Sequence, residues 1–313
     1  MLLVFLSLVV FQLSLAAVAV QIGREAVILK KLPVVVVIAM STFVIPGRAA
    51  AQIQIPVLDR SLPVAPAPNE PETARAPDQS PQRVFDRPVS WKLLFPNLIA
   101  DQKQIWSFPA RLTKCQNWMP TAAVLGTTAG LVLLDPSEGG YFRRTPTFHG
   151  FNNIFTGNTT AVGIGAVPAS LYAIGLIRRN SKMQHTALLA AEAMADAAII
   201  QTVLKDATKR IKPAGFPASG NLHDSWFAKR DGSPSSYIKG NGSFPSGHTM
   251  EAFAVATIIA RRYRNHRWVP YAAYGLASVV GFSRLSLSVH FLSDVGMGAA
   301  LGYSISRFTV LRQ

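Results

Sequence analysis

After residue 89 the hydrophobic positions fall into long runs, separated by short polar segments that contain glycine, proline or charged residues. The runs cover residues 118–134, 160–177, 186–204, 248–262, 269–282 and 290–311. Their lengths are typical of helices, and none shows the alternation of apolar and polar residues that indicates a half-buried strand. We therefore expect an all-α domain over residues 90–313, a bundle of about six helices.

Small residues recur through the runs 186–204, 269–282 and 290–311, which allows helices to approach closely. Most of the runs are shorter than the ~20 apolar residues that cross a bilayer. Glu192 and Asp196 also lie one turn apart within 186–204. This pattern favours a water-exposed or partly membrane-embedded bundle over a full set of spanning helices. Residues 213–243 form a long polar stretch, which is either a functional loop or a disordered one.

The N-terminal region is typical of export or membrane anchoring. Residues 1–23 contain no charged side chain, and a second apolar run, 32–47, follows two lysines and ends at the small residues 49–51. A secretory signal cleaved near Ala51 and a pair of membrane helices both fit this pattern. We assign residues 1–51 to an export signal or membrane anchor.

Proline recurs through residues 52–89, where aromatic residues are few. Such a chain cannot bury enough apolar surface to offset the entropy lost on ordering. The composition predicts a disordered linker between the N-terminal segment and the helical domain.

The composition and net charge of the chain indicate which classes of binding partner to expect. Hydrophobic residues make up 49% of the 313 residues and charged residues 15%, compared with about 25% charged in soluble proteins. The net charge of +15 favours anionic partners such as phosphate groups or acidic lipid headgroups. No nucleic-acid recognition motif and no zinc-ligand spacing is present, so neither nucleic acid nor a metal ion is expected. The single cysteine, Cys115, excludes an intrachain disulfide.

A first chemical motif, 244–248, leads into the run 248–262 and reads Phe-Pro-Ser-Gly-His. Ser246 is a favourable N-cap, and Gly247 lets the backbone approach a ligand closely. The first N–H groups of a helix have no internal partners and can bind an anion, which would place His248 beside that anion. Taken alone, such a motif more often marks a plain helix cap.

A second motif combines Ser283-Arg284 with His290 and Asp294. The histidine and the aspartate are four residues apart, so on a helix they lie on one face within hydrogen-bond reach. Asp294 would then accept a hydrogen bond from one ring nitrogen and leave the other free as a nucleophile. Arg284 offers a planar fork that suits two phosphate oxygens. An isolated pair at this spacing is also typical of a solvated or capping arrangement.

A third, weaker motif consists of Lys205 and Lys212-Pro213, near the end of the run 186–204. Lys209 lies one turn from Lys205 on the same face. Cations at the C-terminus of a helix also complement its dipole, which is sufficient to explain them.

In order and spacing, the three motifs together resemble the type 2 phosphatidic acid phosphatase superfamily, which includes bacterial acid phosphatases and vanadium haloperoxidases. The family pattern is Lys, six residues, Arg-Pro; then Pro-Ser-Gly-His; then Ser-Arg, five residues, His, three residues, Asp. The second and third blocks are complete here, and the first departs from the pattern at one position, Lys212. The resemblance extends from about residue 91 to the C-terminus and implies a bundle of about six helices.

The resemblance implies a metal-independent phosphatase that needs no cofactor. His290 would attack phosphorus, Asp294 would hold its imidazole, and His248 would protonate the leaving oxygen. Water would then hydrolyse the phosphohistidine. Residues of a second set would bind the phosphate oxygens: Lys205, Lys212, Ser246, Gly247 and Arg284.

Lysine at position 212 stands where the family has arginine. It keeps the charge but loses the bidentate fork, so we expect reduced rather than absent activity. Whether Lys209 or Arg210 takes over the fork is open from the sequence.

Two other functions fit the same motifs. A vanadate-dependent haloperoxidase would hold vanadate in the phosphate site, and a non-catalytic envelope protein would retain only the anion site. We expect a phosphorylated substrate, a phosphate monoester or diphosphate. The hydrophobic bundle favours a lipid-linked phosphate, and a small soluble ester is the open alternative. The hydrophobic bundle and the N-terminal segment also favour contact with a membrane surface and a location in the cell envelope, membrane-associated or periplasmic after export.

Overall fold

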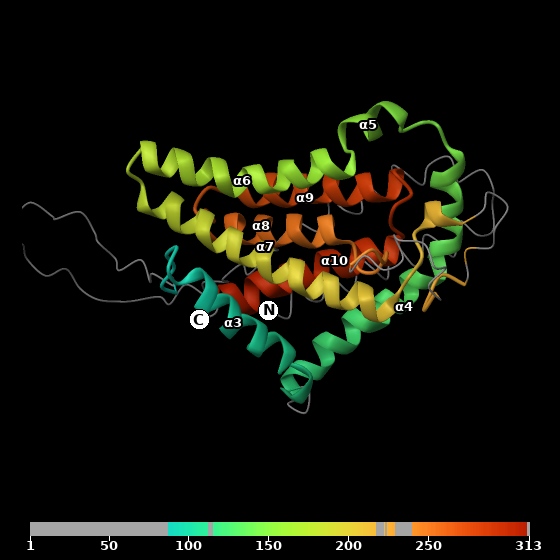
Figure 1. Ribbon diagram of the computed structural model, residues 1–313, viewed down its shortest axis with the longest axis horizontal. Coiled ribbons are helices and arrows are strands. Elements are labelled where there is room, and N and C mark those ends of the chain that lie inside the picture. The colour runs from blue at the N-terminus through green and yellow to red at the C-terminus, as the bar shows by residue number, and fades with distance from the viewer. Residues whose placement is uncertain (1–86, 112–114, 217–221, 223, 229–239, 312–313) are drawn as a thin grey trace, which may run out of the picture.

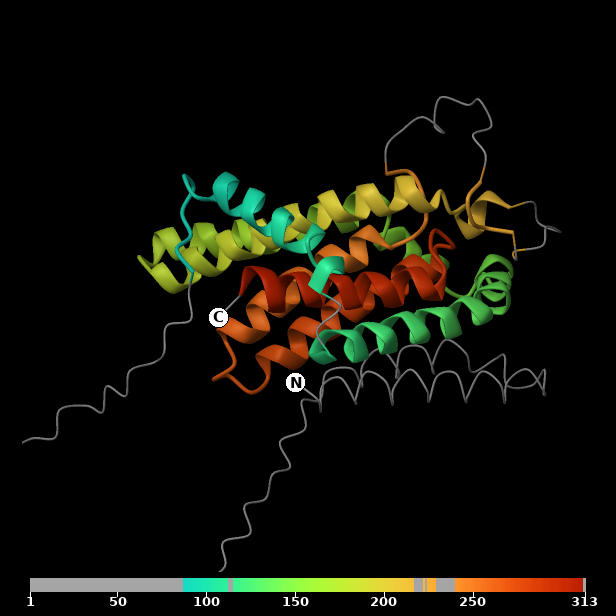
Figure 2. The same ribbon diagram turned by 90° about the horizontal axis from the view of Figure 1, so that it is seen from below.

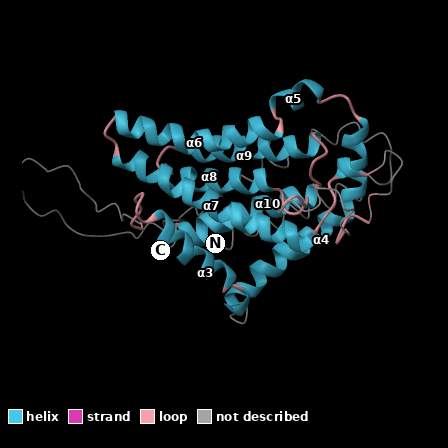
Figure 3. Cartoon of the chain, in the orientation of Figure 1, coloured by secondary structure: helices cyan, strands magenta, loops and turns pink. Residues whose placement is uncertain are grey.

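The computed structural model of the protein describes residues 87–111, 115–216, 222, 224–228 and 240–311. Within these ranges every regular element is a helix, which confirms the predicted all-α bundle (Figure 3). The predictions for residues 1–51, and nearly all of the predicted linker 52–89, lie outside the described residues.

Six helices correspond to the predicted runs: α4 (Cys115–Arg144), α6 (Gly157–Ile177), α7 (Ser181–Thr208), α8 (Gly247–Arg262), α9 (Val269–Ser286) and α10 (Leu292–Ser304). A π-helical segment, η5 (Ile305–Val310), continues α10, and two short 3-10 helices are η2 (Pro109–Arg111) and η3 (Pro213–Gly215). Two further helices, α3 (Leu94–Trp106) and α5 (His149–Ile154), were not predicted.

Helix α3 escaped prediction because part of its buried face is polar. Asp101 is buried and pairs with Arg87 through a 2.7 Å contact between Nη1 and Oδ1. Gln102 donates from Nε2 to Oδ1 of Asp196 at 2.8 Å. A search for apolar periodicity does not register a helix that packs through such contacts.

Glu192 and Asp196 of α7 are buried against this N-terminal segment, where Arg87 also pairs with Glu192. The two carboxyl groups therefore face a buried polar contact with the N-terminal segment rather than solvent. Two carboxyl groups one turn apart are compatible with burial when neighbouring segments supply a cation and an amide donor.

Helix α8 lies in the middle of the bundle and packs against α7, α9 and α10 (Figure 1). Helices α6 and α7 form an antiparallel hairpin along one side. Helix α4 packs against the beginning of α10, and the view from below shows it running along the opposite side of the bundle from α7 (Figure 2). The central helices α8, α9 and α10 are thus flanked by three long outer helices, α4, α6 and α7.

Local capping sets the lengths of the long hairpin helices. The side chain of Thr156 accepts a hydrogen bond from the backbone of Thr159 at the start of α6, and that of Asn180 does the same for Met183 at the start of α7. Helix α7 ends where Lys209 adopts a left-handed conformation with φ of 44°. This ending turns the chain toward Lys212 at the same end of the bundle.

Helices α4, α6 and α7 are long and apolar enough to cross a membrane, judged by length and composition. Their membrane-length segments are Trp118–Arg144, Gly157–Ile177 and Ser181–Gly215. The expectation that most of the apolar runs are too short to span is therefore wrong for these three, because each helix extends beyond the run that was recognised.

Candidate active site

Four helix ends meet at one end of the bundle and bring the predicted residues together. Lys205 lies in the last turn of α7, His248 in the first turn of α8 and Arg284 in the last turn of α9. His290 and Asp294 lie at the beginning of α10. In Figure 1 this is the end where α10 begins beside α4. The charges of Arg284, His290 and Lys205 all act on His248, so the three sequence motifs form one site.

The histidine and aspartate of the second motif face each other as predicted, but not along a helix. Helix α10 begins at Leu292, so His290 precedes the helix while Asp294 lies in its first turn. Nδ1 of His290 is 3.5 Å from Oδ2 of Asp294. The same Oδ2 accepts a hydrogen bond from the backbone N–H of Phe291 at 2.8 Å and so caps α10. The aspartate therefore positions both the helix and the imidazole.

Asp294 is fully buried and ionised. Burial would raise its pKa, but the adjacent imidazole of His290 and the charge of Arg210 outweigh burial and lower that pKa below its ordinary value. The hydroxyl of Ser243 acts in the same direction and donates to Oδ2 at 2.5 Å. The carboxylate thus remains an acceptor for the imidazole over the whole neutral range.

His290 is held as a neutral imidazole. Burial lowers its pKa, the Asp294 carboxylate partly offsets that effect, and the charges of Lys205 and Lys212 lower the pKa further. When Nδ1–H faces Asp294, the lone pair lies on Nε2. A neutral ring of fixed tautomer beside cationic side chains is the arrangement that a nucleophile for an anionic phosphate requires.

His248 lies across the site at the start of α8. Its Nε2 is 3.0 Å from the backbone oxygen of Gly157, the first residue of α6. Burial lowers the pKa of His248 to about 4, and the charge of Arg284 acts in the same direction. A bound phosphate dianion would oppose both effects and favour the protonated imidazole.

Arg284 is almost completely buried in the last turn of α9. Its Nη2 donates to Oγ1 of Thr160 at 2.8 Å and to the backbone oxygen of Phe155, and its Nε donates to Oγ of Ser283 at 3.0 Å. Burial lowers the pKa of the guanidinium to about 10, so it stays charged at neutral pH. The α5–α6 connection and α6 therefore fix this arginine in one orientation.

The start of α8 has a tight contact that the sequence did not reveal. Ser246 occupies the N-cap position, but its hydroxyl exchanges a hydrogen bond with the hydroxyl of Thr249 at 2.9 Å and does not cap a backbone group. Gly247 packs directly against Gln201 of α7, since a Cβ at this position would lie 1.5 Å from Oε1 of Gln201. Any side chain at this position would therefore displace the side-chain amide of Gln201.

The lysines of the third motif lie on the same side of the site. Lys205 and Lys212 are both partly buried, and Nζ of Lys212 is 3.3 Å from Oδ1 of Asn241. Lys209 is exposed at the end of α7. Arg210 is buried and bonds to Asp294 from behind. Arg210 therefore does not supply the fork that Lys212 lacks.

Three residues hold the site together in a role that the sequence analysis did not assign to them: Ser243, Arg210 and Asp135. Ser243 contacts Asp294, and Arg210 bridges Asp294 and Asp135. A usable signal existed for Asp135, because a carboxylate within a long apolar helix is costly unless it has a dedicated partner. Ser243 and Arg210 carry no such signal, since serine before a turn and arginine after a helix are common.

Comparison with known proteins supports the resemblance noted from the motifs. The model of the PAP2 superfamily matches residues 186–313, a range that contains all eight predicted site residues. The resemblance to this superfamily is thereby confirmed for the C-terminal part of the chain.

The similar curated proteins match over short segments. One is the lipid A 1-phosphatase of Porphyromonas gingivalis, 46% identical over 61 residues, which are 19% of this chain and 14% of that protein. Another is phosphatidylglycerophosphatase B of Bacillus subtilis, 33% identical over 112 residues, which are 33% of this chain and 46% of that protein. The chain thus spans less than half the length of either relative.

Among solved structures, a transmembrane PAP2 type phosphatidylglycerolphosphate phosphatase from Bacillus subtilis aligns with 68% of this chain and 94% of its own. The TM-score is 0.35 and the sequence identity 20%.

Proposed function

Because residues 186–313 match the PAP2 superfamily, we propose that the protein is a phosphatase that hydrolyses phosphate monoesters or diphosphates through a phosphohistidine intermediate, without a metal ion. One observation carries this proposal. A neutral histidine of fixed tautomer, His290, lies against a buried carboxylate and among the cationic side chains of Lys205, Lys212 and Arg284.

In the first step Nε2 of His290 attacks phosphorus, and the bond to the leaving oxygen breaks. The imidazole becomes positively charged, and its Nδ1–H donates to Asp294, which lies 3.5 Å away in the free site. The buried carboxylate stabilises this charge without accepting the proton. The negative charge that develops on the phosphoryl oxygens falls among Lys205, Lys212, Arg284 and the N–H groups at the start of α8.

His248 supplies the proton that the leaving oxygen needs. With a pKa of about 4 in the free site, His248 is mostly unprotonated at neutral pH. The two negative charges of a bound phosphate raise that pKa and favour the protonated form. After the leaving group departs, the neutral imidazole accepts a proton from a water molecule. That water attacks phosphorus, breaks the phosphorus–nitrogen bond and releases inorganic phosphate.

A lipid-linked phosphate is the substrate class that the surroundings favour. The site lies at the ends of α7 and α6, two helices long and apolar enough to cross a membrane. The curated relatives named above are phosphatases of lipid A and of phosphatidylglycerophosphate. We place the enzyme in the cell envelope, with residues 1–51 as export signal or anchor, 52–89 as linker and 90–313 as the phosphatase domain.

The test is phosphate release from an aryl phosphate and from phosphatidate in the presence of EDTA. Wild type should turn over both, and His290→Ala should lose turnover by at least about a thousandfold. His185→Ala, which removes an exposed histidine on α7, is the matched control and should keep full activity. Brief incubation with labelled substrate should also trap an acid-labile, alkali-stable phosphoprotein in wild type only.

Each result bears on a different part of the proposal. Loss of wild-type activity in EDTA with recovery on adding metal would refute metal independence. A folded wild type that releases no phosphate from either substrate would refute phosphatase activity, and bromination after loading with vanadate would then identify a haloperoxidase. The ratio of the two substrates separates a lipid phosphatase from a soluble one.

A further inference from the structure

We propose that Arg210 and Asp135 form a positioning pair, which holds the Asp294 carboxylate in the orientation that aligns His290. Neither residue belongs to the three sequence motifs. The inference rests on the proposed function, because it assigns His290 as the nucleophile. It adds a role for α4, the long outer helix that carries Asp135.

Arg210 is fixed on every side. Its Nη1 donates to Oδ1 of Asp294 at 2.6 Å, its Nη2 donates to Oδ2 of Asp135 at 2.6 Å, and its Nε donates to Oγ of Ser225 at 3.1 Å. The guanidinium lies between two aromatic rings, 4.1 Å from the centre of Trp226 and 4.2 Å from that of Phe291. With only 2% of its surface exposed, Arg210 is part of the wall behind Asp294.

The two oxygens of Asp294 have separate tasks because of this contact. Oδ1 receives Arg210, whereas Oδ2 receives Ser243 and the backbone of Phe291 and faces the imidazole of His290. A carboxylate held at only one oxygen can rotate about its last bond. The contact to Oδ1 removes that freedom and keeps Oδ2 toward Nδ1.

Arg210 also acts on the same carboxylate through its backbone. Its carbonyl oxygen accepts a hydrogen bond from the N–H of Ser243 at 2.8 Å. The hydroxyl of Ser243 in turn donates to Oδ2 of Asp294. One residue therefore orients both oxygens of Asp294, Oδ1 directly and Oδ2 through Ser243.

Asp135 connects this arrangement to α4. Its Oδ1 accepts from the backbone N–H of Ser293 at 3.0 Å, and its Oδ2 accepts from the hydroxyl of Ser293 at 2.5 Å as well as from Arg210. Asp135 thus binds the first turn of α10 and the guanidinium together, with 1% of its surface exposed. Because His290 directly precedes that turn, a shift of α4 would move the nucleophile.

Charge explains why the two residues act as a pair. Arg210 is one cation between two buried carboxylates, those of Asp135 and Asp294. Without Asp135 its charge would act on Asp294 alone and weaken the carboxylate as an acceptor for the imidazole. Without Arg210 two buried carboxylates would face each other uncompensated, which would put folding itself at risk.

The experiment therefore centres on Asp135→Asn, which keeps the shape and removes the charge. The rate of phosphohistidine formation in a single turnover should fall about 10- to 100-fold, with KM little changed, since misplacement of a reacting group on the order of 1 Å has this effect. The 15N signal of His290, assigned by its loss in His290→Ala, should shift, and its titration should move to lower pH.

The matched control is Glu138→Gln on the same helix. Glu138 is also buried and accepts from the backbone N–H of Leu292 at 3.3 Å, a contact that the amide oxygen of Gln can keep, and no hydrogen bond or ion pair joins it to Arg210. This variant can lower the melting temperature, but it should leave the rate and the 15N signal of His290 as in wild type. A purely structural role for Asp135 predicts the same behaviour for both variants, and that result would overturn the proposal.

Arg210→Lys tests the pair from the other side and is safer for folding than loss of the charge. Lysine can reach one carboxylate but lacks the fork, so the rate should fall as for Asp135→Asn. The double variant should be no slower than the slower single variant, because both disturb one contact. Losses that simply multiply would contradict the pair.

If wild type itself forms no phosphohistidine, the proposed function fails, while the 15N comparison still decides whether Asp135 controls the imidazole of His290.

Discussion

Two groups of helices in this molecule are both rich in glycine and apolar residues, but one group is packed inside the bundle and the other is exposed on its outside. The C-terminal helices α8 and α10 are packed so closely that their backbones touch. A Cβ at Gly298 would lie 2.6 Å from the backbone oxygen of Ser246, and one at Gly302 would lie 2.1 Å from that of Met250. The outer helices α4 and α6 carry glycines too, yet Gly126, Gly130, Gly163 and Gly165 have no such neighbour within 4 Å.

The comparison shows that glycine in an apolar helix has two meanings. In α8 and α10 the small residues bring His248 and His290 to one site through direct contact of the helices. In α4 and α6 large apolar side chains such as Leu133 and Ile177 are 80% and 82% exposed. A surface of that kind on helices of membrane-spanning length suits lipid contact. The inner group fixes the chemistry and the outer group surrounds it.

The largest expected effect comes from adding one methyl group between the inner helices. Gly302→Ala should destabilise the protein by about 3 kcal/mol, because backbone atoms of α8 cannot move aside as a side chain would. The melting temperature in detergent should fall by about 6–12 °C. Gly165→Ala on α6 is the control. Alanine favours a helix by up to about 1 kcal/mol, so that protein should be as stable as wild type or more so. Equal stability of the two variants would contradict the comparison.

The second-largest effect is expected at Arg284 of α9, which Thr160 of the outer helix α6 holds in place beside the site. Arg284→Lys should reduce kcat/KM about 100-fold, since lysine cannot keep the contacts to Thr160 and Ser283 and still present a fork to the phosphate. Arg261→Lys, an exposed change at the other end of α8, should have no effect. Kinetics on folded proteins with matched circular dichroism spectra provide the measurement. Wild-type kinetics for Arg284→Lys would remove this residue from the site.

Much of this arrangement follows from the sequence, because local patterns determine it. Apolar periodicity located the six long helices, and motif spacing located His248, Arg284, His290 and Asp294, which the fold brings to one end. The acceptor for His290 was found through its spacing, although His290 lies outside the helix that the spacing implied. The spacing of two residues in a motif therefore predicts that they lie close together more reliably than it predicts the helix that contains them.

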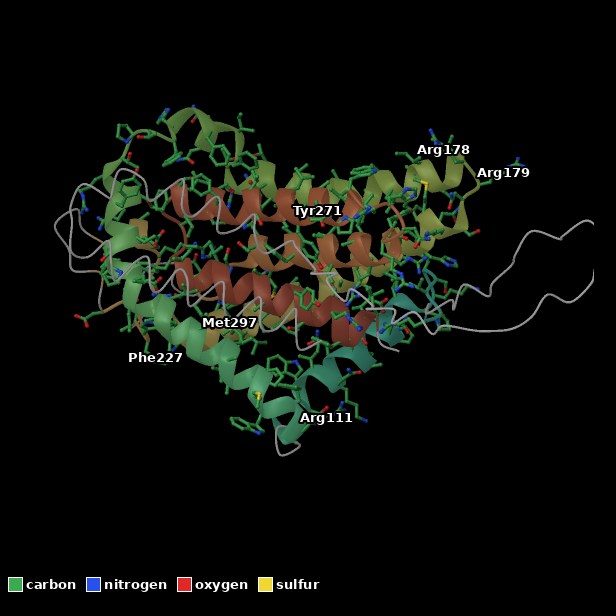
Figure 4. All side chains as sticks on the ribbon, turned by 180° about the vertical axis from the view of Figure 1, so that it is seen from behind. Arg111, Arg178, Arg179, Phe227, Tyr271 and Met297 are labelled. Atoms are coloured by element: carbon green, nitrogen blue, oxygen red, sulfur yellow. The ribbon has the colours of Figure 1, made fainter. Side chains whose placement is uncertain are left out.

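The parts that escaped prediction depend on contacts between segments far apart in sequence. Whether a glycine faces a neighbouring backbone or open space is decided by helix packing, as at Gly302 and Gly165. Arg210 pairs with two aspartates that lie 75 and 84 residues away in the sequence. The exposure of arginine side chains also depends on packing, as the turn between α6 and α7 shows. Arg178 and Arg179 project into solvent there (Figure 4), whereas Arg210 and Arg284 are buried, and nothing local in the sequence separates these arginines.

The pH dependence of the rate tests the role of His248, which is half-buried in the first turn of α8. Its lowered pKa means that the protonated form dominates in the free enzyme only below about pH 4. If this form is the acid, kcat/KM corrected for titration of the substrate should fall about tenfold per pH unit above that value. His248→Asn, assayed with an aryl phosphate that has a good leaving group, should lose this slope. A flat profile between pH 5 and 8 in wild type would exclude His248 as the acid.

A smaller gain is expected where the chain leaves the outer helix α7. Lys212→Arg restores the fork of the family pattern beside the site, so kcat/KM should equal or exceed that of wild type by up to about tenfold, the worth of one charge-assisted hydrogen bond. Lys209→Arg, at an exposed position on the same connection, is the control and should change nothing. A Lys212→Arg enzyme slower than wild type would show that the site is shaped around lysine.

The smallest effect is expected on the outer face of α4, and it tests the comparison from the opposite direction. Leu133→Ala removes an apolar side chain that is 80% exposed, so the free energy of unfolding in detergent should change by less than about 0.5 kcal/mol. Leu285→Ala removes the same atoms from a fully buried position on α9 and should cost about 2–5 kcal/mol. A loss at Leu133 as large as that at Leu285 would mean that another protein surface covers α4. The outer face would then be a second core rather than a boundary with lipid.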